Sequence, residues 1–310
     1  MNTFEILAPI LLLVALGHFL ARVRFLGPEF IGDLNKLAFW VALPALLFRS
    51  AARAGPSGAE ALHLSGLMVL VTLLAAAAGW MAAAALGLPR RSRGTLAQSA
   101  FRGNLAYIAI PVLSYALEGA EGGHEAFSTA VIVMTLLMAV YNVLAVLVLQ
   151  ASRGEASRGM AGAALKGIIK NPLLLAGLAG LLAGVSHTPL PLFLDRTLEA
   201  LGGAAVPISL LCIGGSLHAA KFGGRAAPIA AAAVLKTAGV PLLVYWLAPA
   251  FGLSAAELRI ALVLGAAPTA AASYVMASQM DGDGPLASGS IVLSTVLAAI
   301  SVPLALWLSS

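Results

Sequence analysis

Apolar runs of about 20 residues follow one another along the whole chain, and they constrain the fold more than any other feature. A transmembrane helix needs about 20 predominantly apolar residues, because the hydrocarbon core of a bilayer is about 30 Å thick. Ten such runs cover residues 4–22, 34–52, 62–86, 96–117, 126–149, 164–185, 197–217, 227–251, 257–279 and 286–308. The chain is 60% hydrophobic and 10% charged, against roughly 25% charged residues in a soluble domain. The sequence therefore predicts an all-α membrane protein with ten transmembrane helices and no soluble domain.

The basic residues predict the orientation of these helices. Connections after odd-numbered runs hold Arg22, Arg24, Arg90, Arg91, Arg93, Arg153, Arg158, Lys166, Lys170, Lys221 and Arg225, whereas the even-numbered ones hold Arg49, Arg53, Arg196 and Arg259. Because cytoplasmic loops carry the excess of Lys and Arg, we expect a multi-pass protein with both termini outside the cytoplasm. In the bacterial inner membrane that we expect as its location, this side is the periplasm. The formal charge of +5 then needs no nucleic-acid partner, and membrane lipid is the expected surrounding.

The polar segment 151–163 divides the runs into five and five, which predicts a first repeat (1–150), a cytoplasmic linker and a second repeat (164–310). An odd number of spans per repeat inverts the second copy. Pro44 in span 2 matches Pro207 in span 7, and Pro111 in span 4 matches Pro268 in span 9. We therefore expect two inverted five-helix repeats, with helices 4 and 9 broken at their prolines and crossing.

A broken helix inside a membrane points to a binding site. Proline removes a helical donor and clashes with the carbonyl four residues back, and an unsatisfied backbone group in hydrocarbon costs several kcal/mol, so such a break lies against protein or a water-filled cavity. Half-helices starting after Pro111 and Pro268 would direct free N–H groups and a partial charge of about +0.5 toward the bilayer centre. This arrangement is typical of transporters and favours an anionic substrate.

Polar side chains near the two breaks complete the predicted site. Asn104 and Asn142 are amides in central apolar runs, with an interhelical hydrogen bond as the alternative to substrate binding. The candidate substrate-binding residues are Asn104, Pro111, Val112, Asn142, Lys236, Pro268, Thr269 and Ser273. Lys236 is either a counter-charge near the anion path or an anchor at the membrane interface. Arg102 is interpreted as an anchor that reaches the cytoplasmic surface.

Other function classes find less support in the sequence. No acidic side chain lies in the middle of span 4 or span 9, so a carboxylate-based proton or sodium site at the crossing is not expected. No phosphate-binding glycine loop and no metal-ligand spacing of histidines appears, and "DGDGP" (281–285) is interpreted as a turn, so we expect no cofactor or metal. The chain is expected not to be an enzyme. A channel, a ligand-binding sensor and an intramembrane enzyme are the alternatives.

Several segments together resemble the auxin efflux carrier family, which includes plant auxin carriers and bacterial organic-acid transporters. The resemblance runs through "LNKLAFWVALPALLF", "FRGNLAYIAIPVLSY", "KNPLLLAGLAGLL", "PISLLCIGGSL", "LKTAGVPLL" and the segment from "LRIALVLGAAPTAAASY" to the C-terminus. It implies a scaffold of helices 1, 2, 6 and 7, a transport domain of helices 3–5 and 8–10, and elevator-type alternating access. It also implies that Pro111 and Pro268 are crossover prolines and that Asn104 and Asn142 face the substrate.

The chain departs from the plant carriers in two ways: the long central loop is missing, and helix 3 has no acidic residue. Plant-style regulation and a proton site in helix 3 are therefore not assumed, and neither is auxin as the substrate. The class predicted is a small organic anion, such as an auxin-like or malonate-like carboxylate. The family resemblance is compatible with a homodimer.

Overall fold

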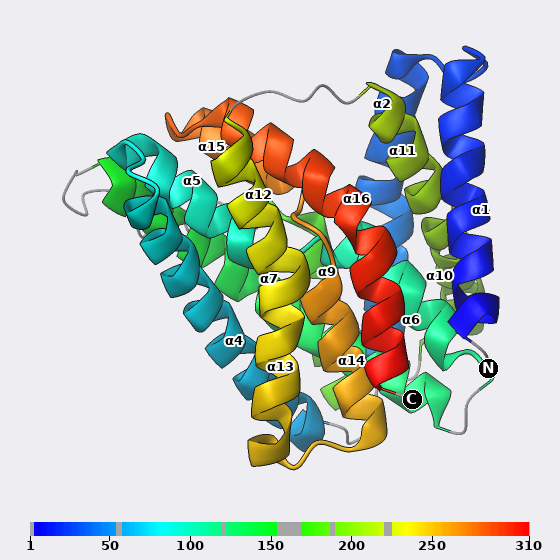
Figure 1. Cartoon of the computed structure of the whole chain (residues 1–310). Coiled ribbons are helices and arrows are strands. Elements are labelled where there is room, and N and C mark those ends of the chain that lie inside the picture. Colours follow the sequence, from blue (N-terminus) through cyan, green and yellow to red (C-terminus); the bar gives the residue numbers. More distant parts are fainter. Residues whose placement is uncertain are drawn as a thin grey trace. The chain divides into compact units, whose positions relative to one another are not determined.

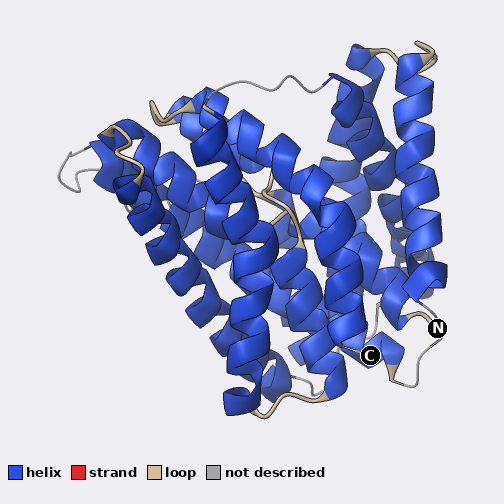
Figure 2. Cartoon of the chain, viewed as in Figure 1, coloured by secondary structure: helices blue, strands red, loops and turns tan. Residues whose placement is uncertain are grey.

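The computed structural model describes residues 3–53, 58–119, 122–153, 169–186, 190–219 and 225–309, and it is built from helices (Figures 1 and 2). The predicted linker 151–163 lies outside the described residues from position 154 onward. Within the described part, six helical stretches are long and apolar enough to cross a membrane: Pro28–Ala52, Ala61–Ala85, Gly123–Arg153, Leu192–Gly215, Ala226–Phe251 and Gly284–Leu308. This confirms an all-α membrane protein.

Helices make up most of the described part of every predicted apolar run. In the first half they are α1 (Thr3–Arg22), α2 (Pro28–Leu37), η1 (Ala38–Ala42), α3 (Leu43–Ala52), α4 (Gly58–Ala85), α5 (Arg90–Phe101), η2 (Leu105–Ala109), α6 (Ile110–Leu117) and α7 (Gly123–Arg153). In the second half they are α9 (Pro172–Val185), α10 (Leu192–Gly203), α11 (Ala205–Ala219), α12 (Ala226–Val234), η3 (Leu235–Gly239), α13 (Val240–Leu247), η4 (Ala248–Phe251), α14 (Ala255–Ala266), α15 (Ala272–Gln279) and α16 (Gly284–Leu308).

Three of the short elements are π-helical turns, and each is followed by a proline. Pro44, Pro111 and Pro241 are each the second residue after η1, η2 and η3, respectively. Proline lacks the N–H of a regular helical bond, and its ring collides with the preceding turn. A π-helical turn pairs residues five apart and so widens the helix at that point. These prolines therefore lie within continuous helical segments.

The described helices pack into two compact units, and each unit draws helices from both halves of the sequence. Unit 1 comprises residues 1–62, 106–136 and 169–220; unit 2 comprises residues 63–105, 137–168 and 221–310. Unit 1 thus contains α1, α2, α3, α6, α9, α10 and α11, together with the first part of α7. Unit 2 contains most of α4, all of α5, the second part of α7 and α12 to α16.

Unit 1 is held by closely packed helix pairs and by one group of ion pairs. Helix α1 packs along α11, where Gly17 and Gly214 each leave no room for a Cβ against the backbone of the other helix. Helix α3 packs against α9 and α10. Such close backbone approach through small residues is the usual packing of membrane helices.

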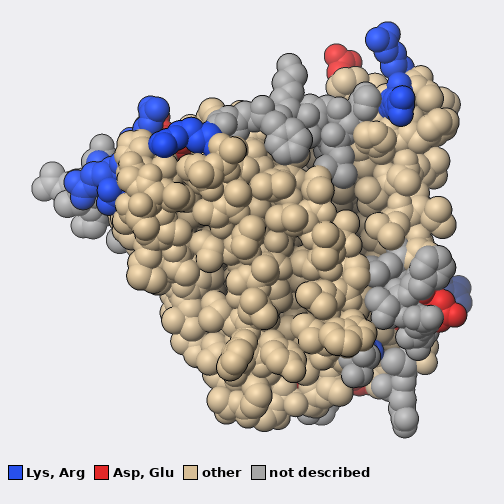
Figure 3. Space-filling model, viewed as in Figure 1, with Lys and Arg blue, Asp and Glu red and all other residues tan. Residues whose placement is uncertain are grey.

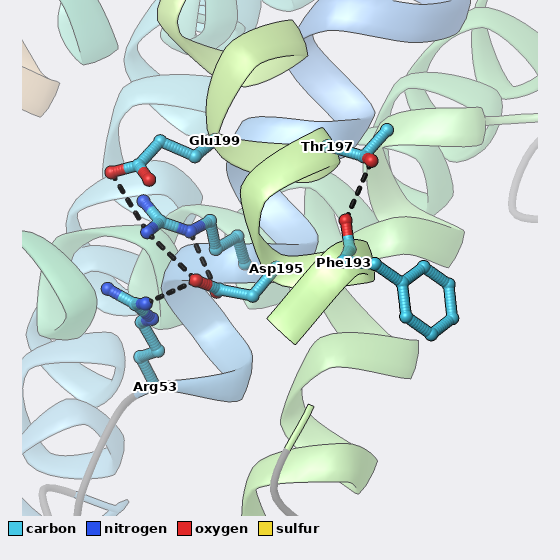
Figure 4. Close-up of polar contacts among 6 residues, drawn as sticks. Arg53, Phe193, Asp195, Thr197 and Glu199 are labelled. Carbon is cyan, nitrogen blue, oxygen red and sulfur yellow. Dashed lines mark hydrogen bonds and ion pairs between the residues drawn. The ribbon is translucent and has the colours of Figure 1, made fainter. Parts of the chain in front are cut away.

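The ion pairs of unit 1 join α3 to α10 (Figure 4). The Asp195 carboxylate accepts from Arg49 Nε at 2.9 Å and from Arg53 Nη2 at 2.6 Å, while Glu199 Oε1 lies 3.0 Å from Arg49 Nη2. Each arginine of this cluster therefore has a carboxylate partner.

Unit 2 buries a polar helix. Helix α5 is buried at nearly every position from Ser92 to Phe101 and packs against α12, α15 and α16. The predicted turn at 281–285 is present: Asp283 begins α16, its carboxylate accepts from Ser92 Oγ at 2.7 Å, and its N–H donates to Thr95 Oγ1 at 2.9 Å. Over α4, α13 and α16 the visible surface of this unit is almost free of charge, and Lys and Arg gather at the end where α5 begins (Figure 3). That distribution suits a surface facing hydrocarbon.

Candidate functional site: a crossover with two buried cations

Two extended segments cross inside unit 2. The segment after α5 and the segment after α14 form one antiparallel β-bridge, between Gly103 and Thr269. On one side of the bridge the Asn104 N–H donates to the Pro268 carbonyl at 2.7 Å, and on the other the Ala270 N–H donates to the Arg102 carbonyl at 2.9 Å. Figure 2 draws this break as loop in the interior of the unit, and Figure 1 shows it continuing from α14. The two breaks therefore satisfy each other's backbone groups, as the absence of water in a bilayer requires.

The position of the first break corrects the prediction for Pro111 and Val112. Helix α5 ends at Phe101 and helical structure resumes at Leu105, so the interruption precedes Pro111 by several residues. Pro111 and Val112 are buried in α6, within unit 1. The prediction was wrong because the π-helical turn η2 accommodates the proline, while the break itself occurs at a glycine. In span 9 the prediction was right, since Pro268 lies between α14 and α15.

The carbonyl groups at the C-terminal ends of both half-helices find donors within unit 2. The last carbonyls of a helix have no helical partner and carry its negative pole. At α5, the Ser99 carbonyl accepts from Thr269 Oγ1 at 2.8 Å. At α14, the Gly265 carbonyl accepts from Lys236 Nζ, and the Ala266 carbonyl accepts from Ser301 Oγ at 3.1 Å.

The N-terminal end of α15 differs from these C-terminal ends, because two of its backbone N–H groups have no acceptor among the described residues. Among the described residues, the backbone N–H groups of Ala271 and Ala272 meet no acceptor, and both residues are exposed. The Thr269 N–H, by contrast, donates to Ser294 Oγ at 3.0 Å. Free N–H groups and the positive helix pole together attract anions.

Arg102 lies at the crossover rather than at the membrane surface. Its side chain is 7% exposed; Nη2 donates to Asn142 Oδ1 at 2.7 Å, and Nη1 contacts the sulfur of Met276. The anchor interpretation was wrong because α5 begins at Arg90, which places Arg102 about 18 Å along the helix axis at 1.5 Å per residue. Since a guanidinium only donates, the Asn142 atom facing it is the oxygen. The Asn142 Nδ2 is then directed elsewhere, and it is buried without a partner among the described residues.

A second contact between α5 and α15 lies one helical turn earlier. Gln98 Nε2 donates to the Ser273 carbonyl at 2.8 Å, and both residues are fully buried. The unpartnered buried atoms in this region are Gln98 Oε1, Ser99 Oγ, Ser273 Oγ and Asn142 Nδ2. An unsatisfied buried polar group costs about 1–3 kcal/mol, so these atoms are suited to bind a polar ligand or water.

Lys236 is the second buried cation. It is 0% exposed and extends from η3 to the last turn of α14. A Cβ on Gly103 would lie 3.2 Å from Lys236 Cε and 3.5 Å from Nζ, so the ammonium group lies beside the crossover. Of the two interpretations left open by the sequence, burial excludes the interface anchor.

Of the predicted site residues, unit 2 brings Pro268, Thr269, Ser273, Asn142 and Lys236 together around the crossover. Asn104 is half-buried there. Sequence reasoning missed Gln98 and Ser99 as site residues and misplaced Arg102. The sequence pattern that could have identified them is a set of polar side chains at helical spacing on one membrane helix, at positions 95, 98, 99 and 102. Tyr141, whose hydroxyl faces Thr72 and the Gly103 N–H, was also missed.

Unit 2 also has an apolar groove, which is chemically distinct from the polar crossover. That groove, of about 290 Å³, lies between α4 and α13 and is lined almost entirely by apolar atoms, including those of Ala75, Leu242 and Trp246. Within the described ranges, no group of three or more His, Cys, Asp or Glu side chains is placed to hold a metal ion. The crossover therefore offers donors and positive charge, which suit an anion.

Comparison with known proteins identifies the class of the chain as a membrane transporter. The profile of the membrane transport protein family matches residues 2–306, and the chain belongs to this family. The resemblance to the auxin efflux carriers is thereby confirmed.

Similar proteins of known sequence are also transporters. An uncharacterized transporter of Methanothermobacter thermautotrophicus is 27% identical over 305 residues, which cover 98% of this chain and 97% of the relative. An uncharacterized transporter of Methanocaldococcus jannaschii is 24% identical over 320 residues, with 99% of both chains covered. The rat sodium/bile acid cotransporter 4 is 33% identical over 120 residues, which cover 38% of this chain and 28% of the relative.

Proposed function

We propose that this chain is a secondary transporter of small organic anions, carboxylates in particular. The observation that carries the proposal is the crossover of unit 2, where two buried cations lie among unpartnered polar atoms. Arg102 and Lys236 form no ion pair with any described carboxylate, and the N-terminus of α15 adds two free N–H groups. A carboxylate at this position gains their attraction, and transporter sites of this kind direct half-helix N-termini at anionic groups.

Each polar residue of the crossover has a role in the proposed site. Asn142 offers Nδ2 as a donor because Arg102 holds its oxygen. Ser273 offers a hydroxyl, and Asn104 lies half-buried next to Pro268. Thr269 holds the two segments together, since its hydroxyl and its N–H are both engaged by the protein.

The favourable terms at this site are modest, which suits a carrier. A helix N-terminus contributes up to about 2 kcal/mol to anion binding in a partly buried geometry, and desolvating a carboxylate costs several kcal/mol. The buried cations offset the remainder. A site in this balance binds its substrate and also releases it.

The proposed transport mechanism is elevator-type alternating access, with unit 2 as the moving domain. The division of the helices into units supports this mechanism: α1, α2, α3, α9, α10 and α11 cluster in unit 1, and these are the spans that the family resemblance assigns to the scaffold. Residues 106–136, which the resemblance assigns to the transport domain, cluster with unit 1 instead. The proposed setting is a bacterial inner membrane. The distribution of basic residues supports an orientation with both termini in the periplasm.

The test is transport by purified protein. A thermal-shift screen of mono- and dicarboxylates selects an acid that raises the unfolding temperature, and counterflow of that radiolabelled acid is then measured in proteoliposomes. We expect saturable counterflow that unlabelled acid inhibits. Binding without counterflow would identify a sensor instead, and flux that does not saturate would identify a channel.

A further inference from the structure

The ammonium group of Lys236 occupies a position that secondary transporters often use for a metal cation. In broken-helix transporters, unwound carbonyls and the C-terminal ends of half-helices coordinate the coupling Na⁺ or H⁺. Lys236 Nζ donates to the carbonyl of Gly265, which is in the last turn of the half-helix α14. The negative pole at the C-terminal end of α14, where a metal ion would bind, is therefore already occupied by the ammonium group of Lys236.

The surroundings of Lys236 fit this position. Gly103 has no side chain, and a Cβ there would lie 3.2 Å from Lys236 Cε, so the glycine leaves the space that the lysine needs. The neighbouring Ala266 carbonyl is satisfied by Ser301 Oγ. The end of α14 thus has two side-chain donors, one of them charged, and its last carbonyls are engaged without an external ion.

The positive charge of Lys236 is also available to bind an anionic substrate. An ammonium has three donors, of which one is used on Gly265. No described carboxylate forms an ion pair with Lys236, and Arg102, the other cation at the crossover, adds a charge of the same sign. A metal cation at the Gly265 carbonyl would lie next to the ammonium group of Lys236, and two like charges so close are unfavourable in a low-dielectric interior.

We propose that Lys236 is a built-in counter-cation, and that this chain transports its organic anion without Na⁺. The inference rests on the proposed transport function and specifies the coupling of the same site. It distinguishes the chain from the relative whose name includes sodium, which matches over 120 residues only. Lys236 holds the end of α14 at the crossover and supplies the charge that makes the anion bind.

The first experiment measures counterflow of the selected acid in NaCl and in N-methylglucamine chloride at equal ionic strength. The wild-type protein is expected to give the same initial rate in both salts. A rate that falls when Na⁺ is replaced would overturn the inference. Absence of counterflow in both salts would instead contradict the proposed function.

Two further measurements separate charge from structure. Lys236→Gln retains an N–H donor for Gly265 but removes the charge, and it should abolish counterflow; Lys36→Gln, which changes an exposed lysine paired with Asp33, should leave it unchanged. Normal counterflow by Lys236→Gln would contradict a counter-cation. The unfolding temperature of the wild-type protein is then measured without substrate in the same two salts. This measurement tests for a Na⁺ site independently of transport. We expect equal unfolding temperatures, whereas a rise specific to Na⁺ would show a metal site and reject the inference.

Discussion

The arginine side chains of the two units have different kinds of partner. In unit 1, Arg49 forms ion pairs with Asp195 and Glu199, and Arg53 forms one with Asp195 (Figure 4). In unit 2, the partners of the Arg102 side chain among the described residues are the amide oxygen of Asn142 and the sulfur of Met276. A charge inside a protein is costly unless it is paired. The cluster of unit 1 therefore stabilises the fold, whereas we propose that Arg102 binds the transported anion.

The largest expected effect follows from removing the charge of Arg102. Losing one partner of a buried, hydrogen-bonded charge pair costs about 2–5 kcal/mol of binding, which is roughly 30-fold or more in affinity. Arg102→Gln should therefore weaken binding of the transported acid by at least this factor in isothermal titration calorimetry. Arg259→Gln is the control, because Arg259 contacts Ser309 within the same unit. Equal affinities of the two variants would show that Arg102 serves the fold alone.

A smaller effect is expected when the space beside Lys236 is filled. Gly103→Ala places a Cβ 3.2 Å from Lys236 Cε, and overpacking of this kind costs about 1–3 kcal/mol. The variant should unfold at a lower temperature and transport more slowly. Gly203→Ala, where no atom lies within 4 Å of the added Cβ, should lower neither quantity. An unaltered unfolding temperature in Gly103→Ala would mean that the lysine and the glycine do not depend on each other.

A third change removes one of the unpartnered hydroxyl groups. Ser273→Ala removes a buried Oγ that has no partner in the part of the chain that the structure describes, so stability should hold or rise while substrate affinity falls. One hydrogen bond contributes about 0.5–1.5 kcal/mol, which corresponds to roughly a two- to tenfold loss. Ser290→Ala is the matched control, since Ser290 Oγ bonds to its own helix. Loss of stability without loss of affinity in Ser273→Ala would place the hydroxyl in the fold rather than the site.

The smallest effect on transport is expected in unit 1. Asp195→Asn should lower the unfolding temperature more than Glu199→Gln does, because Asp195 pairs with both arginines and is 13% exposed, whereas Glu199 is 60% exposed. Neither change should alter the affinity for the acid. Thermal unfolding with binding measurements on the same samples checks both statements, and a loss of affinity in either variant would contradict the division between the units.

The sequence was sufficient for the fold class and for the position of the second break. Hydropathy located the helical runs, because their length is set by the bilayer, and Pro268 marked an interruption. The first break was misplaced, because a proline is not by itself a break. Pro111 follows a π-helical turn, and the chain opens instead at Gly103, where it meets Thr269. Only the three-dimensional pairing of the two segments identifies that glycine.

The polar residues that meet at the crossover were also predicted only in part. Asn142, Thr269 and Ser273 were found as polar groups in apolar runs. Arg102 was misplaced because the apolar run begins at residue 96, whereas α5 begins at Arg90, so its depth was underestimated. The contacts from Gln98 to Ser273 and from Lys236 to Gly265 join residues far apart in the chain, and single-sequence patterns contain no information on such pairs.

The most direct test of the account introduces a carboxylate next to Arg102, so that this arginine forms an ion pair as the arginines of unit 1 do. Asn142→Asp replaces the amide oxygen at 2.7 Å from Arg102 by a charged one, and equilibrium binding of the radiolabelled acid is measured for this variant and for the wild type. The account predicts saturable binding by the wild type and none by Asn142→Asp, with an unfolding temperature that does not fall. Equal affinity in the two proteins would contradict the claim that the buried charge at the crossover binds the anion.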